Sequence, residues 1–275
     1  MISGTKERTA MIDFKKKRLF LLDMDGTIYL GDRLFDGTLD FLHRVREMGG
    51  RYLFATNNSS RGVTAYVERL RGMGIDAVEE DFLTSVDATI WYLQGHGFQD
   101  TLIYASGTQT FKDQLRRAGF HITDHREAGI KLLLHGFDTE LTFQKLEDSC
   151  ILLGEPEVDF IATNPDWVCP TAWGSVPDCG SVCEMLFRAT GRRPKVIGKP
   201  EPEMALLAMD RWGCTKEETV LVGDRIYTDI ACGVRAGIDT AFVLSGEGVP
   251  EDIEKYGVRP TETFRDIREI FQHMN

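Results

Sequence analysis

Short apolar runs alternate with longer amphipathic segments along almost the whole chain. Eight of these runs predict strands, over residues 18–25, 51–58, 100–106, 130–137, 159–166, 195–200, 219–224 and 240–246. Several are almost wholly apolar, as expected when helices cover both faces of a parallel sheet. The alternation therefore predicts an α/β protein with right-handed crossovers.

The amphipathic segments between the runs end as helices usually do. Three of them are closed by Gly49, Gly119 and Gly237, and glycine is the favoured residue just after the last helical turn. These segments predict helices in the spaces between the strands.

Composition and charge restrict the partners of the chain. Its 275 residues are enough for one large or two modest domains. The formal net charge of −11 disfavours a general nucleic-acid or anionic-membrane surface. No run approaches the roughly 20 apolar residues of a membrane span, and residues 1–20 lack the apolar stretch of a signal peptide. We expect a cytoplasmic protein with neither nucleic acid nor membrane as partner.

The six cysteines form no C-x-x-C pair and no zinc-like spacing with the six histidines. They are expected to be reduced thiols. Cys179 and Cys183 are four residues apart, a spacing that places two side chains on one face of a helix.

Polar residues end four of the predicted strands. Ligands in open α/β sheets lie beyond the carboxyl ends of the strands, so these residues converge if the four strands share one sheet: Asp23, Asp25, Thr56, Asn57, Lys199 and Asp224. The middle strands end in other chemistry, "YAS", "LHGF" and "TNPD". This contrast predicts a second α/β unit inserted between the second and sixth strands.

The acidic residues suit a hard divalent cation. Asp23 and Asp25, at i and i+2, lie on one side of their strand. Asp224 follows another strand, and Asp229 lies five residues farther on. Mg²⁺ prefers such oxygen ligands, and its charge would offset the repulsion between the carboxylates.

The same residues suit phosphoryl transfer. A carboxylate beside Mg²⁺ can attack phosphorus and form an aspartyl phosphate. A second acid two residues on can protonate the leaving alcohol and then activate water. Lys199, Thr56 and the N–H groups after "TNNSSRG" would hold the phosphoryl oxygens.

Each of these residues also has a structural reading. Asp23 and Asp25 suit a turn and a helix cap, and Lys199 a solvated position. Thr56 suits backbone hydrogen bonds at a strand end, and Asp229 the first turn of a helix.

Four fragments in this order resemble the haloacid dehalogenase-like hydrolases. They are "DMDGT" (23–27), Thr56 in "TNNSS", Lys199 in "GKPEP" and "GDRIYTD" (223–229). "TNNSSRG", the long insert before Lys199 and the segment 162–204 make the chain similar to the NagD-like, 4-nitrophenylphosphatase-type branch.

The resemblance implies a Rossmann-like, three-layer parallel-sheet core formed by 1–83 and 192–275, and an inserted α/β cap domain of the C2 type at 84–191. It implies Asp23 as nucleophile and Asp25 as general acid and base. Mg²⁺ would be held by Asp23, the Asp25 carbonyl and Asp224, with Asp229 in a weaker or outer position. Thr56, Asn57 and Lys199 would hold the phosphate.

The chain departs from its relatives in the inserted part. Many relatives have P-G-x-G-S where this chain has "PDCGS", with Asp178 in place of a flexible glycine and Cys179 after it. Cys169 stands where related vitamin-B6-phosphate phosphatases have histidine. The first difference weakens the transfer of a substrate from any named relative, and the second weakens, without excluding, a pyridoxal-phosphate assignment.

Several other residues have two readings. Residues 29–37 predict a hairpin with a turn at Gly31 and Asp32, either a flap over the site or a structural feature. Trp167, Cys169 and Trp173 either pack in the inserted domain or face the substrate. His135 is expected to be a core residue with its hydrogen bonds satisfied, and Gly246 and Gly248 are assigned no role.

The function expected from these residues is that of a Mg²⁺-dependent phosphatase for small phosphomonoesters: sugar phosphates, nucleoside monophosphates, phosphoglycolate or aryl phosphates. A phosphotransferase or mutase using the same intermediate is the first alternative. A C–halogen hydrolase and a non-catalytic phosphometabolite-binding regulator are weaker ones. A homodimer through the cap is left open.

Overall fold

The computed structural model describes residues 11–60, 62–171 and 173–274. The chain divides into two compact units. The first consists of Met1–Phe54 and Met209–Asn275, and the second of Ala55–Ala208. The assignment of 1–83 and 192–275 to a catalytic core and of 84–191 to a cap remains a prediction.

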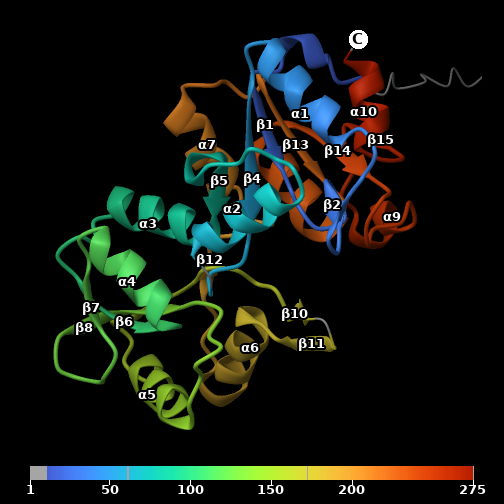
Figure 1. The fold of residues 1–275 in the computed structure, drawn as a ribbon. Coiled ribbons are helices and arrows are strands. Elements are labelled where there is room, and N and C mark those ends of the chain that lie inside the picture. The colour runs from blue at the N-terminus through green and yellow to red at the C-terminus, as the bar shows by residue number, and fades with distance from the viewer. Residues whose placement is uncertain (1–10, 61, 172, 275) are drawn as a thin grey trace, which may run out of the picture. The chain divides into compact units, whose positions relative to one another are not determined.

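A six-stranded sheet lies mostly in the first unit, and its last strand, β5, belongs to the second (Figure 1). Its strand order is β15 (Glu262–Phe264), β14 (Asp239–Val243), β13 (Thr219–Gly223), β1 (Leu19–Leu22), β4 (Arg51–Thr56) and β5 (Phe82–Thr84), and the boundary between the units falls within β4. Leu22 is aligned with Val222 on one side and with Phe54 on the other. All four residues of β1 are buried. Because β1 lies between β13 and β4, the acidic segment 23–25 follows a strand in the interior of the sheet.

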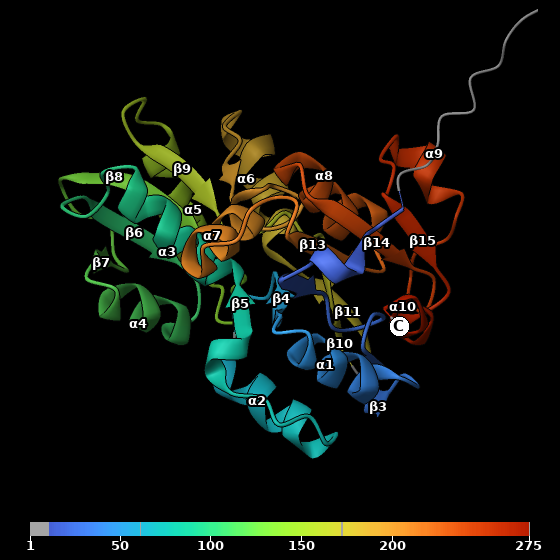
Figure 2. The same ribbon diagram turned by 90° about the horizontal axis from the view of Figure 1, so that it is seen from above.

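Helices cover both faces of this sheet. Figure 2 shows α1 (Thr38–Glu47) and α10 (Ile267–His273) on one face and α8 (Ala231–Ala236) on the other. α9 (Asp252–Tyr256) follows β14, and α7 (Glu203–Trp212) crosses the unit boundary. A short 3-10 helix, Phe14–Lys16, precedes β1. The three-layer α/β fold expected from the sequence is confirmed.

The second unit has its own parallel sheet of five strands. Their order is β12 (Lys195–Val196), β9 (Asp159–Ala162), β8 (Ile130–His135), β6 (Leu102–Ser106) and β7 (His121–Thr123). α3 (Ser85–Gly95) and α4 (Gln109–Arg117) lie on one face, and α5 (Phe143–Leu153) and α6 (Cys179–Thr190) on the other (Figure 1). The unit also holds α2 (Val63–Gly72), the 3-10 helix Glu79–Asp81 and a hairpin of β10 (Val168–Thr171) and β11 (Gly174–Pro177).

The expectation that four polar strand ends share one sheet is wrong for the strand before Lys199. β12 pairs with β9, through Lys195 with Ile161 and Val196 with Ala162, and so belongs to the five-stranded sheet. β1, β4 and β13 do share the six-stranded sheet. A two-residue strand contains no pattern that identifies its neighbour, which is why the sequence could not assign it.

Each of the eight predicted apolar runs contains a strand. The predicted hairpin is also present, because β2 (Tyr29–Leu30) and β3 (Arg33–Leu34) pair antiparallel, and Gly31 in the turn has a φ of 57°. In the part of the chain that the structure describes, no helix is long and apolar enough to cross a membrane.

Candidate active site

The acidic segment turns sharply as it leaves β1. The Asp23 N–H donates to the Val222 carbonyl at 2.9 Å, which continues the pairing of β1 with β13 by one residue. Next, the Met24 carbonyl accepts from the Ile28 N–H at 2.9 Å. Met24 is buried, whereas Asp23 is half-buried and Asp25 is exposed. The two acids are thus more accessible than the residue between them, while the prediction that both carboxylates face one site remains a prediction.

Asp23 lies close to two further acids, which follow the neighbouring strand β13. Oxygen atoms of Asp23, Asp224 and Asp229 all lie within 4.8 Å of one another. Asp224 directly follows β13, and Asp229 lies on a π-helical turn, Ile226–Ile230. Both are only 1% exposed. Asp229 is thus a buried member of the cluster, and it also lies in the first turn of its helix, as its structural reading expected.

Hydrogen bonds hold the two buried acids in place. The Glu247 N–H donates to Asp224 Oδ2 at 2.7 Å, and the Arg225 N–H donates to Asp229 Oδ2 at 3.2 Å. Asp224 Oδ1 is buried and has no hydrogen-bond partner among the residues that the structure describes. Its lone pairs are therefore available to a ligand.

Burial raises the pKa of Asp224 to about 8, and the negative charges of Asp23 and Asp229 act in the same direction. Crowded carboxylates in a buried place disfavour their own ionisation. A divalent cation would remove that repulsion, and carboxylate oxygen is the ligand that hard cations prefer. The donor set, its charge and the unpartnered oxygen all fit such a cation.

Two glycines allow the main chain to come close to Asp224. Gly26 has a φ of +87°, and a Cβ there would collide with the Asp224 carboxylate. A Cβ on Gly246 would collide with the same carboxylate. The Ser245 hydroxyl donates to the Gly26 carbonyl at 2.7 Å and links the two glycine segments. The sequence reading that assigned no role to Gly246 is therefore wrong.

Glu247, which follows β14, is a further residue near Asp224 that the sequence reading did not single out. Besides its bond to Asp224, Glu247 pairs with Arg225 Nε at 2.9 Å and accepts from the Tyr227 hydroxyl at 2.9 Å. "LSGEG" follows a predicted strand. The rule that ligand-binding residues follow parallel strands would have identified it.

The predicted phosphate-binding residues lie in the second unit. The Lys199 ammonium donates to the Ala55 carbonyl at 3.0 Å, and the Asn57 amide donates to the Lys199 carbonyl at 2.8 Å. Lys199 is 4% exposed, so its reading as a solvated lysine is wrong. Thr56 Oγ1 accepts from the Asn58 N–H at 3.2 Å, which agrees with its structural reading and leaves its role toward phosphate a prediction.

The other singled-out residues lie in the second unit. Trp167 and Trp173 are 59% and 77% exposed, so neither packs in a core, whereas Cys169 packs against a buried cluster. Asp178 accepts from the Cys179 N–H and caps α6. Burial raises the pKa of Asp178 to about 6. None of the six cysteines forms a disulfide within the described part of the chain. Predictions that concern residues 1–10 lie outside the described residues.

Two family models match the chain. Residues 20–121 match the model described as haloacid dehalogenase-like hydrolase, and residues 196–270 match a second one described as HAD-hydrolase-like. An acid sugar phosphatase of Staphylococcus aureus is 34% identical over 262 residues, which cover 94% of this chain and 99% of that protein.

Solved structures agree with these matches. A 4-nitrophenylphosphatase from Thermotoga maritima has a TM-score of 0.87 at 38% identity, over 95% of this chain and 99% of that one. A glycerol phosphate phosphatase from Mycobacterium tuberculosis, in complex with magnesium, has a TM-score of 0.86 at 28% identity, over 94% of this chain and 78% of that one. The chain belongs to the haloacid dehalogenase-like hydrolases, in their NagD-like, 4-nitrophenylphosphatase-type branch.

Proposed function

We propose that this chain is a Mg²⁺-dependent phosphatase that hydrolyses small phosphomonoesters through an aspartyl phosphate on Asp23. The observation that carries the proposal is the cluster of Asp23 with the buried Asp224 and Asp229 at the end of the central strand. The relatives support the reaction class, because those compared above are named as phosphatases.

Asp23 and Asp25 divide the covalent work between them. The Asp23 carboxylate attacks phosphorus while the bond from phosphorus to the leaving-group oxygen breaks. Asp25 gives its proton to that oxygen and then takes a proton from the water that hydrolyses the aspartyl phosphate. Asp23 is half-buried, which suits a nucleophile that contacts the phosphate. Asp25 is exposed, which suits an acid and base that exchanges protons with water.

The metal site would use the carboxylates of Asp23 and Asp224 and the main-chain carbonyl of Asp25, with Asp229 in an outer or weaker position. When bound, Mg²⁺ supplies positive charge that offsets the carboxylates and the phosphoryl oxygens. The unpartnered Asp224 Oδ1 and the raised pKa of Asp224 support a cation at this place.

Thr56, Asn57 and Lys199 would hold the phosphoryl group. A buried ammonium needs negative charge or acceptor oxygens around it, and the Ala55 carbonyl is one such acceptor for Lys199. A phosphoryl oxygen would be a second acceptor, and the positive charge of Lys199 would stabilise the negative charge on the phosphoryl group during its transfer.

The substrates would be small. The relatives are named for sugar phosphates, 4-nitrophenyl phosphate and glycerol phosphate, which share the phosphomonoester and differ in the leaving group. Residues 84–191 would form the cap that selects among leaving groups. The location in the cytoplasm and a homodimer through the cap remain predictions.

The test is phosphate release from 4-nitrophenyl phosphate, with Mg²⁺ and with EDTA, by the wild type and Asp23→Asn. Asp40→Asn, an exposed acid on α1, is the matched control. We expect metal-dependent release that is lost in Asp23→Asn and kept in Asp40→Asn. A near-wild-type rate in a folded Asp23→Asn protein would rule out the assigned nucleophile.

A further inference from the structure

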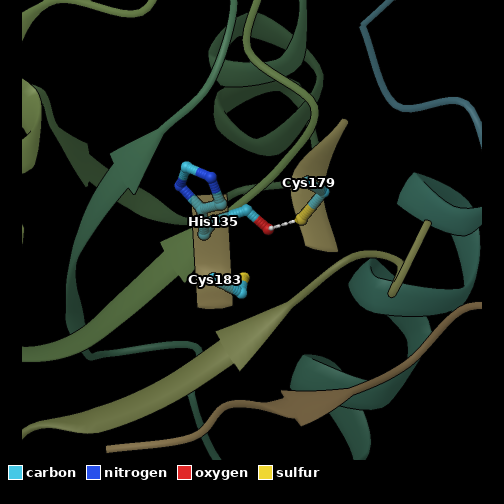
Figure 3. Close-up of side chains that lie close together, drawn as sticks. All are labelled: His135, Cys179 and Cys183. Carbon is cyan, nitrogen blue, oxygen red and sulfur yellow. Dashed lines mark hydrogen bonds between the residues drawn. The ribbon is translucent and has the colours of Figure 1, made fainter. Parts of the chain in front are cut away.

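A second group of metal-ligating side chains lies in the second unit and is separate from the acidic cluster. It consists of His135 at the end of β8, with Cys179 and Cys183 on α6. A ring nitrogen of His135 and the two sulfur atoms lie within 4.8 Å of one another. Figure 3 shows the three residues together, with the main-chain carbonyl of His135 directed at the Cys179 sulfur. His135 and Cys179 are 0% exposed and Cys183 is 6% exposed.

The fold brings these residues together firmly. Cys179 and Cys183 are one helical turn apart, so their side chains lie on the same face of α6. The Cys179 thiol donates to the His135 carbonyl at 3.6 Å. The Gly180 N–H donates to the Asp166 carbonyl at 2.8 Å, and a Cβ at Gly180 would collide with the main chain at Pro165. The thiol thus links the first turn of α6 to the end of β8, and the Gly180 contacts hold the same turn against the segment that follows β9.

His135 lacks the hydrogen bonds that a buried histidine normally makes. Within the described residues neither ring nitrogen has a hydrogen-bond partner, and both are buried. The expectation that His135 is a core residue with satisfied hydrogen bonds is therefore wrong. Burial of a polar ring without hydrogen bonds is unfavourable, so a bound ligand would stabilise this position.

We propose that His135, Cys179 and Cys183 form a binding site for a thiophilic divalent cation of the Zn²⁺ type. Cysteine sulfur and histidine nitrogen are the ligands that Zn²⁺ prefers, with a water or a small ligand completing four-coordination. The site would connect α6 to β8 within the second unit. It is independent of the phosphatase chemistry proposed for Asp23.

The charge of the site favours a divalent ion over a monovalent one. Binding would form two sulfur–metal bonds and one nitrogen–metal bond, and would release one proton from each thiol to solvent. Two thiolates, a neutral imidazole and a divalent cation sum to zero charge. The cysteines belong to an apolar cluster that includes Leu133 and Val182, where a neutral assembly is favoured over a charged one. Mg²⁺, which prefers oxygen, would not compete well.

The probe for this site is Co²⁺, because cobalt bound by thiolate has a charge-transfer band in the near ultraviolet and cobalt bound by carboxylate does not. The full chain is kept reduced with a phosphine and saturated with Mg²⁺ before Co²⁺ is added. We expect the band to saturate at one cobalt per chain and to disappear when Zn²⁺ is added. The same Zn²⁺ should raise the melting temperature.

The variants separate this site from other thiols. Cys183→Ser should lose the band, and His135→Gln should weaken Co²⁺ binding at least about 10-fold while the thiols remain. Cys150→Ser on α5, which packs against the same cluster but lies outside the ligand set, should keep the band. If Cys183→Ser does not fold, the comparison of His135→Gln with Cys150→Ser decides. No thiolate band in the wild type, or a band unchanged in folded His135→Gln or Cys183→Ser, overturns the proposal.

Discussion

Replacing Asp224 with asparagine should stabilise the metal-free protein, although it removes a proposed metal ligand. Asp224 is 1% exposed and lies beside Asp23 and Asp229. The introduced asparagine would keep an oxygen available to the Glu247 N–H, which donates to Asp224 Oδ2 at 2.7 Å in the wild type. Its amide group could donate to the neighbouring carboxylates. The substitution therefore removes a repelling charge and retains the hydrogen bond.

The sign of the pH dependence follows from the raised pKa. Burial and the neighbouring acids raise the pKa of Asp224 from 3.8 to about 8 in the folded protein. Between these two values the folded state binds more protons at this position than the unfolded state. The stability of the metal-free protein is therefore greatest below the unfolded pKa and falls as the pH rises toward the folded one.

The size of the effect can be worked from the same two values. Relative to a residue that stays neutral, Asp224 destabilises the metal-free fold by roughly 2 kcal/mol at about pH 5 and by roughly 5 kcal/mol at about pH 8. At roughly 2 °C per kcal/mol for a chain of this size, the advantage of Asp224→Asn in melting temperature should grow by several degrees over this interval.

The assay is thermal unfolding in EDTA at about pH 5 and about pH 8 for the wild type and Asp224→Asn. Mg²⁺ should raise the melting temperature of the wild type more at the higher pH, and that of the variant little. Asp40→Asn is the control for loss of an acid on an exposed helix face. A variant less stable than the wild type at the higher pH, or an advantage independent of pH, would refute the reasoning.

Three further outcomes are expected. Asp25→Asn should slow hydrolysis of alkyl phosphates more than that of 4-nitrophenyl phosphate, because nitrophenolate needs no proton to leave; equal losses count against the acid role. Gly246→Ala should lower both Mg²⁺ affinity and melting temperature because its Cβ meets the Asp224 carboxylate. The control Gly72→Ala, in open space at the end of α2, should leave Mg²⁺ affinity unchanged and should not lower the melting temperature. Lys199→Met should weaken inhibition by inorganic phosphate at least about 10-fold; unchanged inhibition speaks against phosphate binding.

The parts of the fold that the sequence predicted are those with a strong local pattern. β1, β8 and β13 lie in continuous apolar runs, a pattern that is typical of buried strands and unusual in loops. Helix ends were predictable where glycine adopts the left-handed conformation, as at Gly237 with a φ of 72°. The acid pair at the end of β1 followed from the position of Asp23 directly after a buried strand.

The parts that were missed depend on contacts distant in sequence. β5, β7 and β15 have three residues each, too few for an alternating pattern to be visible. β12 has two, and its place beside β9 depends on pairing that no local pattern encodes. The unpartnered ring of His135 is likewise a property of the packed unit, since the apolar sequence around it is that of any buried strand.

The acidic cluster shows how the main chain can hold like charges together. Three buried or half-buried carboxylates repel one another, so the folded chain has to supply the restraint. It does so with strands: β1, β13 and β14 are parallel neighbours, and the segments that follow them carry Asp23, Asp224 and Gly246. Because Gly26 and Gly246 have no side chain, both segments can approach Asp224 closely. The folded chain therefore holds the carboxylates together even without a ligand, in an arrangement that a cation would stabilise. For the same reason, removal of the Asp224 charge should stabilise the metal-free protein.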